Sequence, residues 1–465
     1  FPTISRQLRL ASMENSEGSM EQQLTKGRQR AVVIGGSIAG LLAARVLSER
    51  FQDVVIIERE MLARDADPRR AVPQGRHAHV LLHKGIQIID QLFPDLLKAL
   101  LDAGLVMADM GQDFRWRHFG VWKTQFPSDI RILFVNRPMF EWQIAARLLA
   151  RPNLRVIEHC IVTGLIASPG ADRVAGIRLR HPDDTEEALT ADLVVDASGR
   201  GSQLPEWLLA LGLNRPDETR VEVNLGYASR ICRRPATLPR WTSLFVIPRP
   251  PATRGAAIFP IDGNRWMVTL AGWLGDYPSQ CDSEYLEFAA SLEVPEVRLS
   301  LERAEPLTPI SVHRFPSNLR RHYERLAIMP QSLIVLGDAL CSFNPVYGQG
   351  MTVAALEAMA LARWLAARES EARDDSHKFQ RAASKLVDIA WQLAVGEDLR
   401  YPGVKGDRPI GTAFLHWYIG LVHQATSVDQ HVARKFYEVI HLLEPPPKLF
   451  NPGVLRRTAA GAFRH

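Results

Sequence analysis

The stretch AVVIGGSIAGLLAARVLSERFQDVVIIERE, residues 31–60, decides the fold of this chain. It opens with a short buried-strand pattern over 31–34 and passes through a glycine-rich turn into an Ala/Leu-rich helix over 38–48. A second apolar strand over 54–57 follows. A strand–turn–helix–strand unit of this kind holds the pyrophosphate of a dinucleotide at the helix N-terminus, where backbone N–H groups and the helix dipole face the anion. The sequence therefore predicts a dinucleotide-binding α/β unit.

The turn itself supplies the residues that we expect to contact the pyrophosphate. They are consecutive small or apolar residues: Gly35, Gly36, Ser37, Ile38, Ala39 and Gly40. Ser37 stands where such turns usually have their second glycine, so the backbone must approach the ligand past a small hydroxyl. Glu58 ends the second strand, 23 residues after Gly35, where a carboxylate hydrogen-bonds the adenosine ribose diol. An acid there favours a 2′-hydroxyl and repels a 2′-phosphate.

Composition excludes several classes of protein. The 56 basic and 51 acidic residues are interspersed, without a run of five like charges, so we expect no nucleic-acid partner. Four widely separated cysteines without a CxxC pair predict reduced thiols, a cytoplasmic location and no metal centre. No apolar run approaches the length of an integral membrane segment. Residues 1–28 are polar and irregular, and we expect a disordered tail there.

The rest of the chain alternates between strand and helix patterns. We expect a helix over 80–101, strands within 109–136, and a helix over 137–150 that starts at Arg137-Pro138. Strands are expected at 154–166, 173–180 and 189–196, then throughout 220–275, where Asp262-Gly263 predicts a hairpin turn. A strand over 333–336 precedes a loop and an alanine-rich helix that reaches about residue 367, and 376–465 is mostly helical.

Two further motifs join the first. DLVVDASGRGS, 192–202, closes a strand into a loop of small residues, and LGDALCSFNPVYGQGM, 336–351, leads to a helix N-terminus. With residues 31–60, these motifs resemble the three signatures of the single-component flavoprotein monooxygenases of the aromatic-hydroxylase and squalene-epoxidase type. The resemblance covers nearly all of 30–368. The phrases VPQGRHAHVLL, RGSQLPEWL and NPVYGQGM further resemble the bacterial polyether-type flavin epoxidases.

This resemblance implies a fold and a division into domains. The fold would be α/β, with a Rossmann-like FAD-binding domain of the glutathione-reductase type, an inserted mainly β-sheet substrate domain and a C-terminal helical region. The FAD-binding domain would be discontinuous and comprise 29–108, 130–219 and 320–368. The substrate domain would comprise 109–129 and 220–319, and the helical region 369–465.

The resemblance also implies roles for individual residues. Asp338 would accept hydrogen bonds from the ribityl chain of the flavin, while Pro345, Gly348 and Gly350 would lie beside its ring. Further cofactor contacts would come from Arg59, Arg76, Arg137, Val162, Asp196, Gly337 and Met351. Tyr227 and Arg230 would line the site, together with the aromatic residues Phe259, Trp266 and Trp273. Neither His77 nor His79 has a carboxylate at ligand spacing, so we expect structural roles for both.

The chemistry implied is oxygen insertion. Non-covalent FAD, reduced by NADH or NADPH directly or through a flavin reductase, would react with O2 to give a flavin C4a-(hydro)peroxide. That species would epoxidise or hydroxylate a largely apolar secondary metabolite, a polyketide or terpenoid of the kind made in antibiotic biosynthesis. No acid or base is evident near the flavin motifs, which favours an alkene or a pre-activated ring as the group attacked.

Three alternatives share the fold. A flavin-dependent halogenase needs a lysine at the site, for which Lys84 is the candidate, although the tryptophan-rich WxWxIP motif is absent. A prenyl-lipid reductase would saturate double bonds with the same cofactor. A GDI-like carrier would have kept the fold without the flavin, but the intact turn, Glu58 and Asp338 argue against it.

Overall fold

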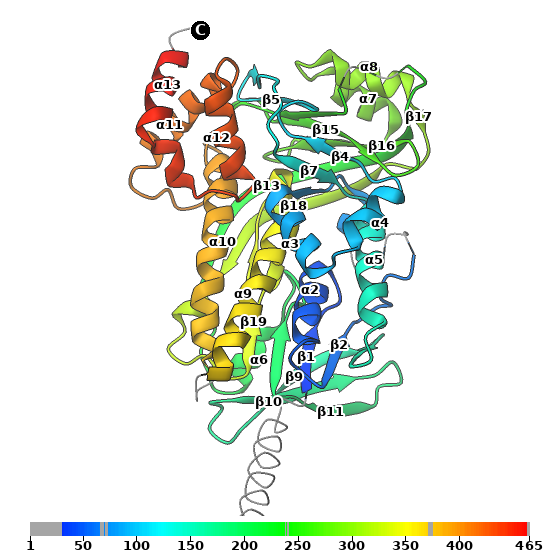
Figure 1. The fold of residues 1–465 in the computed structure, drawn as a ribbon, viewed down its shortest axis with the longest axis vertical. Helices are drawn as coiled ribbons and strands as arrows, with labels where there is room; N and C mark the ends of the chain where they lie inside the picture. Colours follow the sequence, from blue (N-terminus) through cyan, green and yellow to red (C-terminus); the bar gives the residue numbers. More distant parts are fainter. Residues whose placement is uncertain are drawn as a thin grey trace, which may run out of the picture.

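The computed structural model describes residues 30–65, 69, 73–237, 239, 241–370 and 375–462, so the expected tail, 1–28, lies outside the described residues. At its centre is a five-stranded parallel sheet in the order β19-β12-β1-β2-β8 (Figure 1). Its strands are β1 (Arg30–Ile34), β2 (Asp53–Ile57), β8 (Leu154–Ile157), β12 (Leu193–Asp196) and β19 (Leu333–Val335). The three inner strands are almost wholly buried, as expected for a parallel sheet whose faces are covered. The predicted α/β fold is confirmed.

Helices beside this sheet complete the dinucleotide-binding unit. They are α2 (Ile38–Leu47), α5 (Arg137–Leu149), α9 (Gly350–Ser370) and α10 (Ser376–Asp398). Within the described part of the chain, one helix is long and apolar enough to cross a membrane, and that helix is α9. It packs against α2, α3 and α10 (Figure 1), so its apolar composition is that of a core helix. A smaller antiparallel sheet joins β9 (Ile161–Ala167), β10 (Val174–Arg180) and β11 (Glu186–Thr190).

The prediction of a single helix over 80–101 is wrong. The chain instead forms strand β3 (Val80–Leu82), then α3 (His83–Leu92) and α4 (Leu96–Asp102). Strand β3 pairs with β7 (Arg131–Phe134), which also pairs with β4 (Met107–Asp109), in an antiparallel three-stranded sheet. Pro94 separates the two helices, because proline disfavours the helical conformation at the residue before it. The pairing with β7 is a long-range contact that the local helical pattern does not contain.

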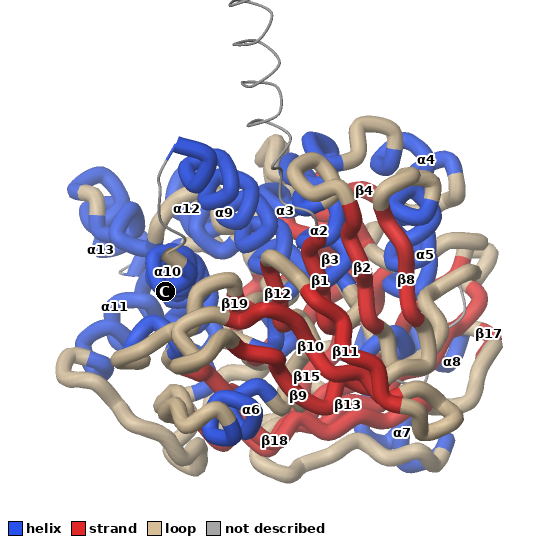
Figure 2. The backbone as a smooth tube through the Cα atoms, turned by 90° about the horizontal axis from the view of Figure 1, so that it is seen from below, coloured by secondary structure: helices blue, strands red, loops and turns tan. Residues whose placement is uncertain are grey.

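A nine-stranded sheet forms the second layer of the molecule, seen edge-on in Figure 1 and below the parallel sheet in Figure 2. Its long strands are β13 (Glu218–Arg233), β14 (Ser243–Ile247), β15 (Arg254–Ile261), β16 (Arg265–Gly272) and β18 (Ser311–Arg321). Shorter strands are β5 (Phe114–His118), β6 (Val121–Trp122), β17 (Glu305–Pro306) and β20 (Cys341–Ser342). The predicted hairpin is confirmed, since β15 and β16 pair across a turn in which Gly263 has a φ of 68°.

Helices enclose this sheet on its two faces. Helices α7 (Asp282–Ala290) and α8 (Pro295–Arg303) lie over the outer face, and the short α6 (Leu204–Ala210) follows the 192–202 motif. The C-terminal helices α11 (Thr412–Ala425), α12 (Gln430–Ile440) and α13 (Pro452–Ala462) gather beside α10 (Figure 1). An apolar cluster joins α11 and α12 to β5, β7 and β15. The helical character expected for the C-terminal region is confirmed.

Candidate active site

One large cavity, with a volume of about 880 Å³, runs from the glycine-rich turn to the C-terminal helices. One end is bounded by the turn between β1 and α2, the loop 197–201 and the segment 337–351. The other end lies between the inner face of the nine-stranded sheet and helices α10, α11 and α12. We call the first part the cofactor end and the second the substrate end.

The glycine-rich turn at the cofactor end is built by close backbone packing. A Cβ on Gly40 would lie 1.8 Å from the carbonyl oxygen of Gly35, so a glycine is required where α2 crosses the turn. Gly35 itself has a φ of 101°, in the region that favours glycine. The Ser37 side chain makes no capping hydrogen bond to α2. The N–H groups of the first helical turn are therefore left for a ligand, which is how helix N-termini bind phosphate.

Glu58 lies where the ribose of a dinucleotide is expected. It follows β2, is 6% exposed and lines the cavity. Its Oε2 accepts a 2.7 Å hydrogen bond from the Gly36 N–H and lies 3.5 Å from the Arg69 guanidinium. The carboxylate therefore also fixes the shape of the turn beside it.

Two arginines and a buried glutamate surround the same turn. Arg137, at the start of α5, donates to Ser37 Oγ at 3.0 Å and to Glu141 Oε1 at 3.0 Å. Arg69 donates to the other oxygen of Glu141 at 3.2 Å, and its Nε is buried without a hydrogen-bond partner. Arg69 and Glu141 were not predicted. The spacing of Glu141, four residues after Arg137 on a helix, was the signal that could have found it.

The segment 337–351 forms the other wall of the cofactor end. Asp338 lines the cavity, and burial raises the pKa of its carboxyl against the opposing effect of Arg137 and Arg200. Gly337 has a φ of 62°, and its N–H donates to Glu357 Oε2 at 2.9 Å. Burial raises the pKa of Glu357 to about 8. Helix α9 then begins at Gly350, whose backbone faces the cavity.

The part of this segment that precedes α9, residues 343–349, is fixed by a buried carboxylate that sequence reasoning missed. Asp398, at the end of α10, accepts hydrogen bonds of 2.8 Å from the side-chain amides of Asn318 and Asn344 and of 3.1 Å from the Tyr347 hydroxyl. Burial raises the pKa of Asp398 to about 6, against the lowering effect of these hydrogen bonds. Asn344 and Tyr347 flank Pro345, so Asp398 holds the loop that contains it.

The structure brings most of the predicted cofactor residues to the cavity. Those that line it are Gly35, Gly36, Ser37, Ile38, Ala39, Glu58, Arg59, Arg137, Val162, Gly337, Asp338, Pro345, Gly348, Gly350 and Met351. Asp196 is fully buried behind the wall, where its carboxylate accepts hydrogen bonds from Ser198 and Ser202 and shapes the lining loop. Arg76 is exposed and does not line the cavity, so its predicted cofactor contact is wrong. Arg69, from the same basic loop, lies there instead.

Strand register decides which predicted residues of the substrate sheet face the cavity. Pairing places Phe259 opposite Met267 and Pro260 opposite Trp266. Adjacent residues on a strand point to opposite faces. Phe259 lines the cavity, whereas Trp266 packs on the outer face among the residues beneath α7 and α8. The proposed lining role of Trp266 is therefore wrong.

The same alternation separates Tyr227 from Arg230 on β13. Tyr227 is on the inner face, where it lines a small adjoining cavity of about 60 Å³ together with Trp273. Arg230 pairs with Asp282, the first residue of α7, on the outer face. The predicted catalytic position of Arg230 is wrong, because the strand turns its side chain away from both cavities.

His77 and His79 each contact another part of the protein; His77 also lines the smaller cavity, and His79 lines both cavities. His77 Nδ1 lies 2.8 Å from Ser229 Oγ, and His79 Nε2 lies 2.7 Å from the carbonyl oxygen of Gln74. Burial lowers the pKa of each imidazole to about 3. Lys84, the lysine considered for a halogenase, is not among the residues that line either cavity.

Aromatic side chains form the wall of the substrate end. Phe114 stacks on Phe134 with ring centroids 6.0 Å apart, and Trp116, Phe245 and Phe259 contact it or one another. These rings come from β5, β7, β14 and β15, which are distant in the sequence. Both segments assigned above to the substrate domain, 109–129 and 220–319, contribute rings to this wall.

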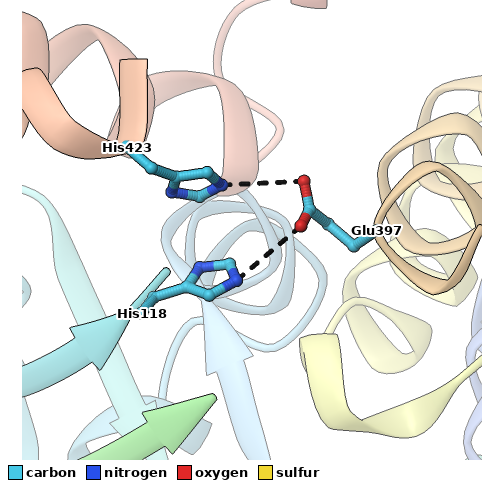
Figure 3. A group of neighbouring side chains, drawn as sticks. All are labelled: His118, Glu397 and His423. Atoms are coloured by element: carbon cyan, nitrogen blue, oxygen red, sulfur yellow. Dashed lines mark ion pairs between the residues drawn. The ribbon is translucent and has the colours of Figure 1, made fainter. Parts of the chain in front are cut away.

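A group of ionisable side chains lies at the same end, in an otherwise apolar environment. We call it the buried histidine cluster, by which we mean His118, Lys123, Glu397 and His423. His118 Nε2 and His423 Nε2 face the two oxygens of Glu397 at 3.7 Å and 3.6 Å (Figure 3). Lys123 Nζ lies 3.2 Å from His423 Nδ1. Sequence reasoning found none of the four, because they come from β5, the segment after β6, α10 and α11.

The cofactor end has the features that FAD requires. A Cβ built on Gly199, Gly201 or Gly350 would meet no atom within 4 Å, so these cavity-lining glycines leave room that the protein itself does not fill. Arg69 Nε and Gln349 Oε1 are buried at the cavity without hydrogen-bond partners. Free N–H groups at the α2 N-terminus, the Glu58 carboxylate and Asp338 provide the donors and acceptors that a dinucleotide needs.

Comparison with known proteins agrees with this geometry. Residues 28–394 match the family described as FAD binding domain. The chain belongs to this family. Over 434 residues, which are 90% of each chain, it is 33% identical to Protein Rv3254 of Mycobacterium tuberculosis. Over 186 residues, 38% of this chain and 37% of the relative, it is 30% identical to kynurenine 3-monooxygenase of Salinispora arenicola.

Solved structures share the fold at low identity. The flavin-dependent brominase Bmp2 superposes with a TM-score of 0.66 at 15% identity, over 93% of this chain and 98% of that one. The p-nitrophenol 4-monooxygenase PnpA of Pseudomonas putida gives a TM-score of 0.61 at 18% identity, over 89% and 98% of the two chains. The chain is therefore an enzyme of the FAD-binding monooxygenase family.

Proposed function

We propose that this enzyme inserts one oxygen atom of O2 into a large and mostly apolar secondary metabolite of the polyketide or terpenoid kind, by hydroxylation or epoxidation. The observation that carries the proposal is the continuity of the cavity, since the same 880 Å³ space reaches from the FAD-binding turn to an aromatic wall. Apart from the end that FAD would fill, this cavity is walled by the aromatic rings Phe114, Trp116, Phe245 and Phe259, a lining that suits a polycyclic or polyene molecule. Catalytic roles for Pro345, Gly348 and Gly350 beside the flavin are part of the proposal.

Bound FAD, once reduced, supplies the activation of O2 and the transfer of one oxygen atom, while the other atom leaves as water. The chain's own residues bind, orient and keep the site dry. The α2 N-terminus, Arg69 and Arg137 would hold the pyrophosphate, and Asp338 would hold the ribityl chain. Asp398 keeps the loop of Pro345 in place through Asn344 and Tyr347. The aromatic wall excludes water, which protects reactive species from hydrolysis.

The electron donor is proposed to be NADH or NADPH, which would bind transiently or act through a flavin reductase. The sequence has one glycine-rich dinucleotide fingerprint, and the FAD adenosine occupies it in this proposal. Stopped-flow reduction of the bound flavin by each nucleotide, with and without substrate, distinguishes the donors. Reduction by neither nucleotide would assign the role to a separate reductase.

A halogenase is the second candidate, supported by the fold that the chain shares with brominase Bmp2. Lys84 does not line the cavity, which removes the lysine first considered for that reaction. The resemblance to polyether-type epoxidases remains a proposal about the substrate and rests on sequence phrases alone.

The test is turnover with isotopically labelled dioxygen against a panel of polycyclic phenols, polyketides and terpenoid alkenes, followed by mass spectrometry. We expect one labelled oxygen in the product. Halide-dependent chlorination or bromination would replace the proposal with the halogenase. A product with saturated double bonds and without labelled oxygen would replace the proposal with the prenyl-lipid reductase.

A further inference from the structure

The buried histidine cluster is placed like a ligand-binding site. His118, Glu397 and His423 line the cavity, and the two imidazoles are 4% and 1% exposed. Their Nε2 atoms face the carboxylate at 3.6–3.7 Å, beyond hydrogen-bonding distance, so the three groups lie around a gap (Figure 3). The Nδ1 of His118 and the Nε2 of His423 are buried without hydrogen-bond partners. Buried polar atoms of this kind call for an explanation.

Lys123 lies behind His423 and completes the cluster. It is 5% exposed, and its Nζ contacts the Nδ1 and the carbonyl oxygen of His423, each at 3.2 Å. Its other neighbours are the rings of Trp116 and Phe436, each centred 5.6 Å from Nζ. Burial lowers the pKa of Lys123 to about 7, with Glu397 opposing the shift. A neutral amine is therefore available close to neutral pH.

Every element packed against Lys123 contributes to its environment. Strand β5 presents His118, α11 presents His423, and α12 presents the uncharged ring of Phe436. Helix α10 presents Glu397, whose charge is paired with Arg400 at 2.9 Å. Burial lowers the pKa of both cluster histidines well below their ordinary value. The cluster therefore combines a carboxylate that is paired with Arg400, two neutral imidazoles and one amine that titrates.

These charges argue against a metal ion, although two histidines and a glutamate are a common ligand set. A divalent cation held by Glu397 and His423 would lie close to the Arg400 guanidinium, which pairs with Glu397, and to the Lys123 amine, which contacts His423. Positive charge at either group would repel the cation. The cluster instead fits a ligand that gives up a proton and carries negative charge.

We propose that the buried histidine cluster binds an acidic hydroxyl of the substrate, a phenol or an enol, and removes its proton. The proposal rests on the proposed function, because it places this hydroxyl on the molecule that is oxygenated. The substrate O–H bond breaks as its proton goes to His423 Nε2. The proton on His423 Nδ1 passes to the neutral Lys123 Nζ. The ring stays neutral, the substrate becomes an anion, Lys123 becomes an ammonium, and no electrons are exchanged.

The consequence is a substrate class. An anionic phenol or enol has raised electron density at its adjacent carbons, and general-base assistance of this kind typically accelerates a step about 10²–10⁴-fold. An isolated alkene has no proton for the cluster to accept. The expectation of an alkene or a pre-activated ring rested on the resemblance to polyether-type epoxidases and on the absence of an evident acid or base. The cluster supplies a base at the substrate end, so the argument from a missing base no longer holds. Hydroxylation of a phenolic or enolic ring is therefore favoured over epoxidation.

The test uses the FAD-loaded enzyme and alizarin, a polycyclic dihydroxyanthraquinone whose absorption moves to longer wavelength when it ionises. Spectra of the bound dye are recorded from pH 5 to pH 10 with EDTA present. We expect Lys123→Met to raise the ionisation midpoint of bound alizarin by about one pH unit and to weaken its binding at pH 7 about tenfold. His423→Gln should do the same, because it breaks the path to Lys123.

Two controls separate this effect from general damage. Lys98→Met removes an exposed lysine of α4, 81% exposed at its side chain, and should leave the alizarin midpoint unchanged. Anthraquinone, which has no hydroxyl, should bind wild type and Lys123→Met with equal affinity. Equal alizarin midpoints in wild type and both cluster variants would overturn the proposal, as would failure of wild type to bind alizarin.

A second measurement addresses the metal alternative. Zinc is titrated into the dialysed holoenzyme without EDTA, and stoichiometric binding that His423→Gln abolishes would replace the proposal with a metal site. The alizarin result does not depend on turnover. If alizarin ionises as expected while no substrate incorporates labelled oxygen, the proposed function fails and the hydroxyl site stands. If oxygen is incorporated while alizarin ionises alike in all variants, the hydroxyl site fails alone.

Discussion

The two ends of the cavity are built in opposite ways. The cofactor end consists largely of three short sequence motifs, and the groups of each motif are close in the chain, as Gly35 and Gly40 are in the turn before α2. The substrate end is assembled from distant elements: His118 on β5 meets His423 on α11 although 305 positions separate them. Backbone geometry defines the first end, and side chains from several elements define the second.

This difference has a chemical reason. A dinucleotide is recognised through backbone N–H groups and glycine-dependent close approach, which a contiguous strand–turn–helix unit supplies. A substrate pocket needs a shaped apolar wall with a few convergent polar groups, and several elements must contribute to it. Substitutions at the two ends should therefore fail differently, with flavin lost at one end and proton transfer lost at the other.

The largest expected effect, complete loss of the flavin together with a loss of stability, is at the turn. Gly40→Ala places a Cβ 1.8 Å from the Gly35 carbonyl oxygen, so the backbone must move. We expect a loss of about 1–3 kcal/mol in the free energy of unfolding and purification without flavin. Gly453→Ala in α13 is the matched control, since its Cβ would meet nothing within 4 Å. Yellow, stable Gly40→Ala protein would show that the turn is not the tight element described.

Next in size is the loss of the ribityl contact. Asp338→Ala should weaken FAD binding by about 1.5–3 kcal/mol, the range for hydrogen bonds to a charged group. Asp282→Ala removes a carboxylate of similar size that pairs with Arg230 on the outer face, and it should leave flavin content unchanged. The readout is flavin absorbance per protein after gel filtration. An undiminished absorbance for Asp338→Ala would place the flavin elsewhere.

At the substrate end, Lys123→Met should make the protein more stable and less active. The folded pKa of about 7 lies below the unfolded value of 10.5, so the folded state disfavours the charged amine. The penalty is full below pH 7 and disappears as pH rises toward 10.5. We therefore expect the variant to gain about 1–3 kcal/mol of unfolding free energy at pH 6 and little at pH 10. Denaturant unfolding at both pH values measures this. If Lys123→Met were less stable than wild type at pH 6, the claim that the folded protein disfavours the charged form of Lys123 would be contradicted.

The smallest effect is at the adenosine end. Glu58→Ala should weaken FAD binding by about 1 kcal/mol, since one polar contact is exchanged for water. The flavin spectrum of the reconstituted variant should match that of wild type, because Glu58 lies at the far side of the turn from the segment 337–351. Fluorescence titration with FAD gives the affinity. A shifted flavin spectrum would mean that Glu58 lies near the ring.

What could be predicted from sequence follows the same division. The parallel sheet, α2, α5, α9 and most residues that line the cofactor end were predicted, because motif spacing and hydrophobic periodicity are local signals. The helix expected over 80–101 was wrong because β3 is defined by pairing with β7. Arg230 and Trp266 were misplaced because a strand pattern does not say which face points to the cavity.

The buried histidine cluster could not be predicted from the sequence, for a related reason. None of its members has a partner at motif spacing, and Lys123 acquires its lowered pKa only by burial beneath α11 and α12. Glu397 and Asp398 are adjacent in sequence but serve different ends of the cavity, the first facing His118 and His423 and the second holding the loop of Pro345. Only the packed structure separates these roles.

The claim that the two ends of the cavity have separate roles is tested most directly by measuring which product the Lys123→Met variant makes from the electrons it receives. The FAD-loaded variant and wild type are supplied with the electron donor, O2 and a phenolic substrate, and hydroxylated product and hydrogen peroxide are both quantified. We predict that the variant keeps its flavin and still consumes O2, but releases mostly hydrogen peroxide where wild type releases product. Loss of flavin from the variant, or an unchanged ratio of product to peroxide, would contradict the account.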